Sequence, residues 1–164
     1  MMIEPNQAFT SSYQGLSLQL RNKVDIFANG KKVEVDALWD TGATNTVISR
    51  KVVSDLALIS TGIMRVKTPS GSNDYNTYLV NIGLPNHVTI TDVCVCDSEI
   101  GDQGVGVLIG MDIITKGDFS VSNYNGITRF TFRIPSIKVT DYAKENTISN
   151  AIGPTHGKGK SKKK

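Results

Sequence analysis

The 164-residue sequence lacks any apolar run long enough to cross a membrane. A membrane-spanning helix needs about 20 consecutive, mainly apolar residues, and no window of the chain approaches that length. The first residues also lack the basic region followed by an apolar run that marks a secretory signal peptide. We therefore expect a protein that does not associate with membranes and that is, by default, cytoplasmic.

Cysteine is scarce, with only Cys94 and Cys96, which lie two residues apart. Alternate residues of a strand point to the same face, so the preferred interpretation is two small buried side chains on the core face. A metal site would need help from His87 or His156, and no further cysteine exists to complete a zinc site. We expect neither a metal nor another cofactor.

The formal net charge of +3 comes from the end of the chain. Without the last eight residues, 13 basic residues face 15 acidic ones. These last eight residues contain no apolar side chain to bury, so we expect them to be disordered. A solvated tail is the preferred interpretation, and a weak contact with nucleic acid or another anionic surface is the alternative. The basic residues of this tail are Lys158, Lys160, Lys162, Lys163 and Lys164.

Short alternating segments, separated by glycine-containing turns, dominate the rest of the sequence. Alternation of apolar and polar residues predicts strands with one buried face. The fold class predicted is mostly β, as a small closed, barrel-like domain with one or two short helices and a long hairpin. The predicted strands are 16–20, 24–28, 32–39, 46–48, 63–67, 75–82, 88–96, 105–110, 119–122 and 127–134.

Turn and capping residues predict one hairpin turn and two short helices. Asn29-Gly30 predicts a tight hairpin between 24–28 and 32–39, because both residues accept a positive φ. Ser49 is a candidate N-cap of a short helix that would end between residues 58 and 61. A helical turn at 111–116 is predicted to end at Gly117.

The most unusual feature is Asp40-Thr41-Gly42-Ala43, directly after the strand predicted at 32–39. Aspartate is depleted in strands, and glycine marks a tight turn or a close backbone approach. Taken alone, such an aspartate is compatible with a turn, a helix N-cap or a surface charge. About seventy residues later the chain supplies Leu108-Ile109-Gly110, two bulky residues and a glycine before a helical turn.

In this order and spacing, residues 16–134 resemble the retropepsin-like aspartic proteases. The resemblance implies that Asp40 is catalytic and that an apolar-apolar-Gly strand passes behind its loop. It implies an N-terminal extension at 1–14, the protease domain at 15–137, and a C-terminal extension with the basic tail at 138–164. The residues implied to support the loop are Thr41, Gly42, Ala43, Ile109 and Gly110. Those implied to form the tip of a substrate-binding flap are Thr68, Ser70, Gly71 and Ser72.

Only one Asp-Thr/Ser-Gly occurs in the sequence, whereas this catalysis needs two carboxylates. The resemblance therefore implies a homodimer in which two copies of Asp40 activate a water that hydrolyses peptide bonds of a polypeptide substrate. The alternative is a non-catalytic domain of the same fold that binds extended peptide. The other aspartates lie in unrelated settings, for example Asp112 in Gly-Met-Asp-Ile.

Three residues depart from the retroviral members of the family. Trp39 stands where a smaller aliphatic residue is usual, and we expect it to fill a subunit interface or a core. Thr44 and Met111 replace an acidic residue and an arginine that pair with each other in those enzymes. The dimer sheet of the retroviral enzymes, which is built from chain termini, is therefore not assumed for this chain.

Overall fold

The structure is a computed structural model that describes residues 7–68, 71–101 and 104–145. The strands, in chain order, are β1 (Gln7–Ser12), β2 (Leu20–Ala28), β3 (Lys31–Trp39), β4 (Val47–Ser49), β5 (Gly62–Thr68), β6 (Gly71–Gly83), β7 (Thr89–Ser98), β8 (Val107–Ile109), β9 (Asp118–Ser122) and β10 (Arg129–Ile134). The helices are α1 (Arg50–Asp55), α2 (Met111–Ile114) and the 3₁₀ turn η2 (Tyr124–Gly126). None of the helices in these ranges is long and apolar enough to cross a membrane.

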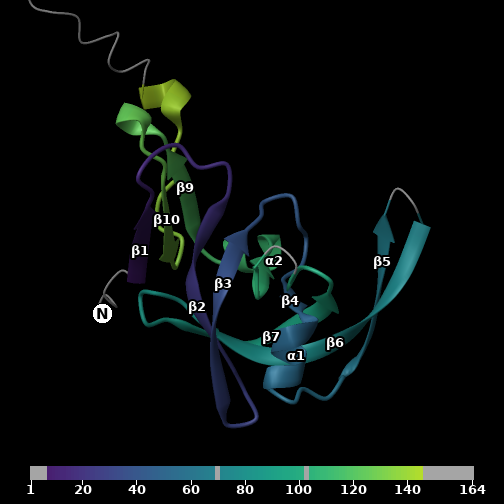
Figure 1. Cartoon of the computed structure of the whole chain (residues 1–164). Helices are drawn as coiled ribbons and strands as arrows, with labels where there is room; N and C mark the ends of the chain where they lie inside the picture. The colour runs from purple at the N-terminus through teal and green to yellow at the C-terminus, as the bar shows by residue number, and fades with distance from the viewer. Residues whose placement is uncertain (1–6, 69–70, 102–103, 146–164) are drawn as a thin grey trace, which may run out of the picture.

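Six strands close into a barrel (Figure 1). The large sheet has the order β2-β3-β8-β4-β7-β6-β5, and β2 also pairs with β6 around Ile26 and Ile82, which joins the two ends of the six-strand part. Within the described part of the chain, the seventh strand, β5, pairs only with β6, and the two form the long hairpin. The predicted mostly-β, barrel-like architecture with few short helices is confirmed.

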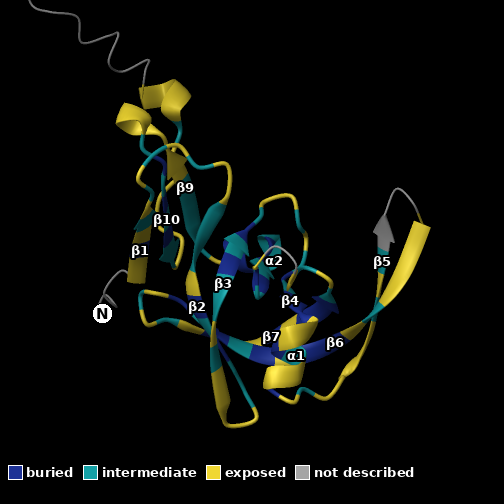
Figure 2. Cartoon of the chain, viewed as in Figure 1, coloured by how far each residue is buried: buried dark blue, intermediate teal, exposed yellow. Residues whose placement is uncertain are grey.

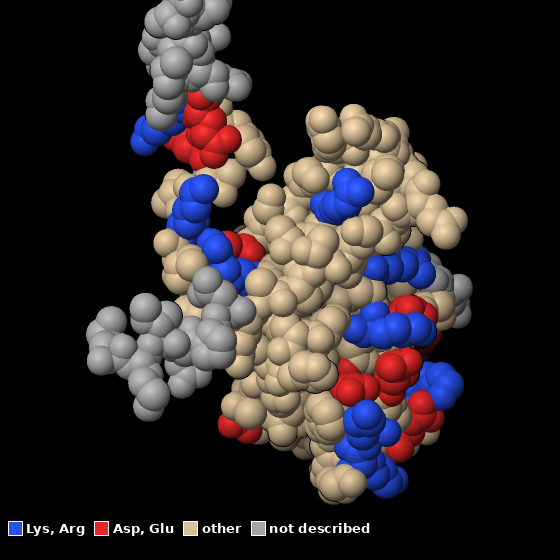
Figure 3. Space-filling view, turned by 90° about the vertical axis from the view of Figure 1, so that its left-hand side faces the viewer, with Lys and Arg blue, Asp and Glu red and all other residues tan. Residues whose placement is uncertain are grey.

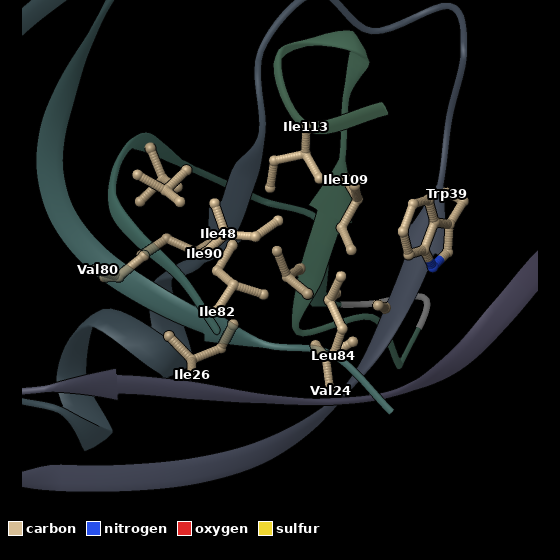
Figure 4. Close-up of a cluster of buried hydrophobic side chains, with 14 of the residues drawn as sticks. Val24, Ile26, Trp39, Ile48, Val80, Ile82, Leu84, Ile90, Ile109 and Ile113 are labelled. Carbon is tan, nitrogen blue, oxygen red and sulfur yellow. The ribbon is translucent and has the colours of Figure 1, made fainter. Parts of the chain in front are cut away.

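The barrel interior is filled by aliphatic side chains. Tyr78, Val80 and Ile82 alternate along β6 and are all buried, as their spacing predicts. They meet inward-pointing residues of the other strands, and several of these side chains are drawn in Figure 4. Burial of each such side chain contributes roughly 1.5–3 kcal/mol. The fully buried members are Ile26, Ile48, Ile82, Val95, Val107 and Ile109.

A second sheet, of order β1-β10-β9, packs on the barrel through aromatic rings. Its inner face carries Phe9, Phe119, Phe130 and Phe132 around the indole of Trp39. The indole stacks on Phe119 at 5.7 Å with an interplanar angle of 10°. Figure 4 shows Trp39 to one side of the aliphatic cluster. Of the two expectations for Trp39, the structure therefore gives it the core between barrel and second sheet.

The strand predicted at 16–20 is wrong in its first part. Leu16 and Leu18 lie in the loop before β2 and are 71% and 103% exposed, so their alternation does not mark a buried face. The first strand is β1 instead, and its pattern is weak because only Phe9 is buried. β1 is ordered by pairing with β10, a partner more than a hundred residues away. The expected boundaries 1–14, 15–137 and 138–164 stay predictions, although β1 connects part of the first segment to the fold.

The expectation for the cysteines is half wrong. Cys96 is buried but Cys94 is exposed. The inward face of β7 is carried by Val93 and Val95, whereas the cysteines point to the opposite face. In β7, Asp92 has a positive φ and lies beside a register shift in the β6–β7 pairing, which marks a bulge. Such a bulge re-aims the residues that follow it.

The predicted helix cap and hairpin turn are correct, whereas the first helix is shorter than predicted. Ser49 is the N-cap of α1, and its side chain accepts the N–H of Val52. Asn29 and Gly30 both have positive φ, as the predicted hairpin turn requires. The helix ends at Asp55, earlier than expected, because the chain turns into a left-handed conformation at Ala57.

Surface charges pair with opposite partners on the β2–β3 hairpin. Lys23 contacts Asp36 at 2.9 Å, and Lys32 contacts Asp25 at 3.3 Å. The lower part of Figure 3 shows blue and red side chains next to each other in this region. Exposed pairs of this kind contribute little to stability. The folded part therefore presents mixed charge here, and the lysine-rich tail lies outside the described residues.

Asp118, at the start of β9, collects several hydrogen bonds. It accepts hydrogen bonds from the side chains of Ser136 and Arg133 and from the backbone N–H groups of Ile137 and Lys138. These donors hold the pKa of Asp118 well below its ordinary value, with the Ser136 hydroxyl as the largest cause. The carboxylate therefore joins β9, β10 and the segment after β10.

We predict that this carboxylate makes the protein sensitive to acid. Because the pKa of Asp118 is lower in the folded state, its contribution is present above the ordinary aspartate pKa of about 4 and is lost as the pH falls below it. In Asp118→Asn, thermal stability at pH 7 should fall, and the further loss between pH 5 and pH 3, a range of roughly one unit either side of that value, should shrink. Asp36→Asn is the control. An unchanged acid dependence in Asp118→Asn would contradict the assignment.

We predict that Trp39→Ala destabilises the protein by about 3–5 kcal/mol, because it leaves a cavity between the barrel and the second sheet. Tyr124→Ala, at a ring that is 75% exposed, should change the free energy of unfolding by less than about 0.5 kcal/mol. Denaturant unfolding measures both. Equal effects of the two substitutions would show that the indole is not part of the core.

Candidate active site

Asp40 lies where β3 leaves the barrel. β3 runs parallel to β8, with Trp39 opposite Ile109, and the N–H of Asp40 donates to the Ile109 carbonyl at 2.9 Å. This bond extends the strand pairing by one residue beyond β3. The aspartate therefore starts its loop from a fixed point, and its side chain is half-buried at the loop entrance.

The loop holds the carboxylate with its own backbone. The N–H of Gly42 donates to Oδ1 of Asp40 at 2.8 Å, and the N–H of Ala43 donates to the Asp40 carbonyl at 3.3 Å. Thr41 and Gly42 are exposed, and Ala43 is half-buried. A hydrogen bond from a backbone N–H fixes the orientation of a carboxylate. The turn predicted from Asp-Thr-Gly thus presents an oriented carboxylate next to exposed backbone.

Ile109 and Gly110 lie behind this loop. Ile109 is fully buried, and a side chain at Gly110 would come within 2.7 Å of the Asn45 backbone and 3.0 Å of the Ala43 carbonyl. Because no such space exists, only glycine allows this close approach. The chain after the glycine then bonds to the loop, as the N–H of Met111 donates to the Ala43 carbonyl at 2.8 Å. Of the five predicted support residues, Thr41, Gly42 and Ala43 therefore lie within the Asp40 loop. Ile109 and Gly110 contact this loop from behind.

Thr46 and Asp112 complete the support, and sequence reasoning missed both roles. Thr46 is fully buried, its hydroxyl donates to Oδ1 of Asp112 at 2.7 Å, and its N–H donates to Oδ2 at 3.0 Å. The same hydroxyl accepts the N–H of Gly110 at 3.2 Å. Asp112 therefore supports the end of the Asp40 loop, although its sequence setting is unrelated to the Asp-Thr-Gly motif. An acidic residue in the first turn of a helix was the available signal.

Backbone groups link the positions where retroviral members carry a charged pair. The N–H of Asp112 donates to the Thr44 carbonyl at 3.1 Å, beside the bond from Met111 to Ala43. Thr44 is exposed and Met111 is half-buried. The loop and α2 are therefore joined here by main-chain bonds and by the Thr46–Asp112 contact.

The β5–β6 hairpin has the form expected of a flap. It is paired continuously from Gly62 opposite Thr77 to Thr68 opposite Gly71, and Ser72 lies opposite Lys67. Figure 2 shows exposed residues along the described outer part of β6, and Figure 1 shows the hairpin extending away from the barrel. Ser70, also predicted at the tip, lies outside the described residues.

Two contacts brace this hairpin. Arg65 and Asp74 form a two-pronged ion pair across it, with Nε to Oδ1 at 2.7 Å, and this lowers the pKa of Asp74. At its base, the Asn45 side-chain amide lies 3.6 Å from Sδ of Met64. The ion pair therefore links the two strands of the hairpin, and the Asn45–Met64 contact links the hairpin to the Asp40 loop.

A hollow of about 360 Å³ opens beside Asp40. Its walls come from the loop before β2, the end of β3 and the strand β9, and they present both polar and apolar surface. The carboxylate is the only charged group among its lining residues. The lining residues are Leu18, Gln19, Leu20, Leu38, Trp39, Asp40, Thr41, Phe119 and Val121.

Among the described residues, no three His, Cys, Asp or Glu side chains lie close enough together to hold a metal ion. The expected absence of a metal or other cofactor stays a prediction. The chemistry available at the site is that of an oriented carboxylate, exposed backbone and an adjacent hollow of mixed polarity.

We predict that Thr46→Val destabilises the protein by about 1–3 kcal/mol, because it leaves the Gly110 N–H and an Asp112 oxygen without their buried partner. Thr115→Val is the matched control, since the Thr115 hydroxyl makes a hydrogen bond at the exposed end of α2. Denaturant unfolding compares the two proteins. A Thr46→Val protein as stable as Thr115→Val would contradict the importance of this buried contact.

Comparison with known proteins places this geometry in a family. The sequence model of the family described as "Aspartyl protease" matches residues 23–113, more than half of the chain, including Asp40 and Gly110. A comparison with curated proteins gives no match.

Three solved structures are similar to this chain. A retropepsin-like aspartic protease from Rickettsia conorii is 13% identical, with a TM-score of 0.53, over 82% of this chain and 99% of that one. The protease of simian foamy virus (mac) is 20% identical, with a TM-score of 0.42, over 57% and 89%. The EIAV protease in complex with the inhibitor HBY-793 is 20% identical, with a TM-score of 0.44, over 62% and 89%. By its sequence match and its retropepsin-like barrel, the chain belongs to the aspartyl protease family.

Proposed function

We propose that the protein is an aspartic endopeptidase that works as a homodimer, with one Asp40 from each subunit. The observation that carries the proposal is the oriented Asp40 carboxylate, held by the Gly42 N–H in a loop fixed to β8. The sequence holds this motif once, so one chain supplies half of the carboxylates that the reaction needs. A two-fold axis beside the loop would supply the other half without any further residue.

In the proposed mechanism the two carboxylates share one proton, because two like charges at close range cannot both form easily. The ionised member takes a proton from a water between them, and the water attacks the peptide carbonyl carbon. The protonated member donates to the carbonyl oxygen. The C–N bond then breaks, and a proton passes to the leaving amine.

Each neighbouring residue has a proposed role in this reaction. The exposed backbone at Thr41 and Gly42 would lie against the second subunit and the substrate. Ala43, Ile109 and Gly110 would keep the carboxylate aimed, since they fix the loop from behind. Thr68, Ser70, Gly71 and Ser72 would form the flap end that closes over an extended polypeptide and excludes water.

Two expectations from the sequence remain predictions. A weak contact with nucleic acid or another anionic surface would use the basic tail, whose residues Lys158, Lys160, Lys162, Lys163 and Lys164 lie outside the described part of the chain. The second expectation that remains a prediction is a cytoplasmic location.

We predict that Asp40→Asn lowers the rate of peptide cleavage by about 10²–10⁴-fold, because the amide can neither accept nor supply the catalytic proton. Digestion of a peptide library, followed by mass spectrometry, measures the rate. Asp55→Asn, in an exposed ion pair with Lys51 on α1, is the matched control and should cleave normally.

Two outcomes would count against the proposal. Cleavage that survives in Asp40→Asn would show that another group does the chemistry. Peptide binding without cleavage, equal in the wild-type protein and Asp40→Asn, would favour the alternative of a non-catalytic peptide-binding domain.

A further inference from the structure

The loop between β1 and β2 forms one wall of the hollow beside Asp40. It covers residues 13–19, and Leu18 and Gln19 of this loop line the hollow. The two leucines of the loop, Leu16 and Leu18, are both exposed, so burial of these side chains does not hold the loop in place. Ordering a loop costs conformational entropy, and here hydrogen bonds to another part of the chain must offset that cost.

Thr128, directly before β10, makes these bonds. Its carbonyl accepts the N–H of Tyr13 at 3.0 Å, and its own N–H donates to the Gly15 carbonyl at 3.0 Å. Its hydroxyl accepts the N–H of Ser17 at 2.9 Å, from a residue 111 positions away in the sequence. One residue therefore bonds to the loop at every second position from Tyr13 to Ser17.

The hydroxyl of Thr128 acts as donor and acceptor at once. While it accepts from Ser17, it donates to Oδ1 of Asn123 at 2.6 Å, just before η2. The residue is only 1% exposed, so water does not compete for these bonds. A buried hydroxyl with both functions filled holds its neighbours in one arrangement. The loop is thus fixed to the turn between β9 and β10.

Ser17 and Tyr13 extend this order to the residues at the hollow. The Ser17 hydroxyl donates to the Gln19 carbonyl at 2.7 Å and accepts the N–H of Gln19 at 3.3 Å, which closes a turn around Leu18. On the other side of this turn, the Tyr13 hydroxyl donates to the Arg21 carbonyl at 2.8 Å. The backbone on both sides of Leu18 is therefore fixed. An exposed leucine held in this way gains free energy when a ligand covers it.

The contact joins two segments to which the family assignment gives no role. The family match covers residues 23–113, whereas the loop at 13–19 precedes that range and Thr128 follows it. Both segments nevertheless act on the surface next to Asp40, because one forms a wall of the hollow and the other holds that wall.

We propose that Thr128 is a positioning residue for the peptide substrate. It holds the loop at 13–19 so that Leu18 lies against a substrate side chain that enters the hollow beside Asp40. Thr128 does not touch the substrate, so it acts on peptide binding through Leu18 and leaves the carboxylate chemistry unchanged. This inference rests on the proposed function, because it takes the hollow as part of the peptide-binding site.

Removal of one hydroxyl group tests this role. In the full-length protein, Thr128→Val removes both side-chain hydrogen bonds and keeps the shape of the residue, whereas Thr128→Ser keeps the hydroxyl. Thr131→Val is the matched control from the same sheet. The Thr131 hydroxyl also donates to a backbone carbonyl, that of Phe9 at 2.8 Å, but this carbonyl lies in β1 and not in the loop.

We expect Thr128→Val to raise KM by about fivefold and to change kcat by less than about twofold, because a displaced wall weakens ground-state and transition-state binding alike. Thr128→Ser and Thr131→Val should keep the wild-type KM. Steady-state kinetics on one peptide, chosen because the wild-type protein cleaves it in the library digest, measures both constants. A wild-type KM in Thr128→Val, or an equal rise in Thr131→Val, would overturn the proposal.

The two exposed leucines of the loop provide a second measurement. Leu18→Ala should raise KM as Thr128→Val does, whereas Leu16→Ala should not, because Leu16 is exposed in the same loop but does not line the hollow. The double variant Leu18→Ala/Thr128→Val should raise KM by less than the product of the two single effects, since both act through one contact. Independent effects, or equal effects of the two leucines, would contradict a role exerted through Leu18.

Peptide binding separates this inference from the catalytic proposal. In an Asp40→Asn background, the same substitutions report the dissociation constant of the labelled peptide, measured by fluorescence anisotropy. If the wild-type protein cleaves peptides but Thr128→Val matches Thr131→Val in KM and in binding, the positioning role is wrong and the endopeptidase proposal stands. If no peptide is cleaved but Thr128→Val alone weakens binding of a library peptide, the catalytic proposal fails and the role of Thr128 stands.

Discussion

The buried contact between Thr46, Asp112 and Gly110 is the constraint on which the site depends. Thr46 is the only one of the three whose side chain bonds to both of the others. Through it, the end of the Asp40 loop, the end of β8 and the start of α2 form one unit. The bond from the Asp40 N–H to the Ile109 carbonyl fixes the other end of the loop. The carboxylate is thus aimed by groups that are not themselves reactive.

The two sheets have different roles in positioning Asp40. Closure of the barrel by pairing of β2 with β6 gives β3 and β8 a rigid parallel contact, and the Asp40 loop begins at its end. The second sheet covers Trp39 with phenylalanine rings and leaves β9 at its open edge. Trp39 therefore connects the core to the site, because its ring is part of the core and the next residue along the chain is Asp40.

Elements that depend on neighbouring residues can be predicted from the sequence. Elements and contacts that depend on residues far along the chain cannot. The Asn29-Gly30 turn, the Ser49 cap and the strand before Asp40 are correct because each depends on neighbours in the chain. β1 has no such pattern, since it is ordered by β10. The contact between Thr46 and Asp112 spans 66 residues and joins two common polar residues, so no spacing rule marks it. Leu16 and Leu18 show the reverse error, because a pattern of period two is present where no strand forms.

The central claim is that one chain holds half of an active site, and mixing subunits tests it most directly. Wild-type and Asp40→Asn chains are unfolded together, refolded at varied ratios and assayed for peptide cleavage at constant total protein. If both carboxylates are needed, activity follows the square of the wild-type fraction, and an equal mixture retains about one quarter of the wild-type activity. Activity that falls in simple proportion, to about one half, would show that each chain acts alone and would contradict the account.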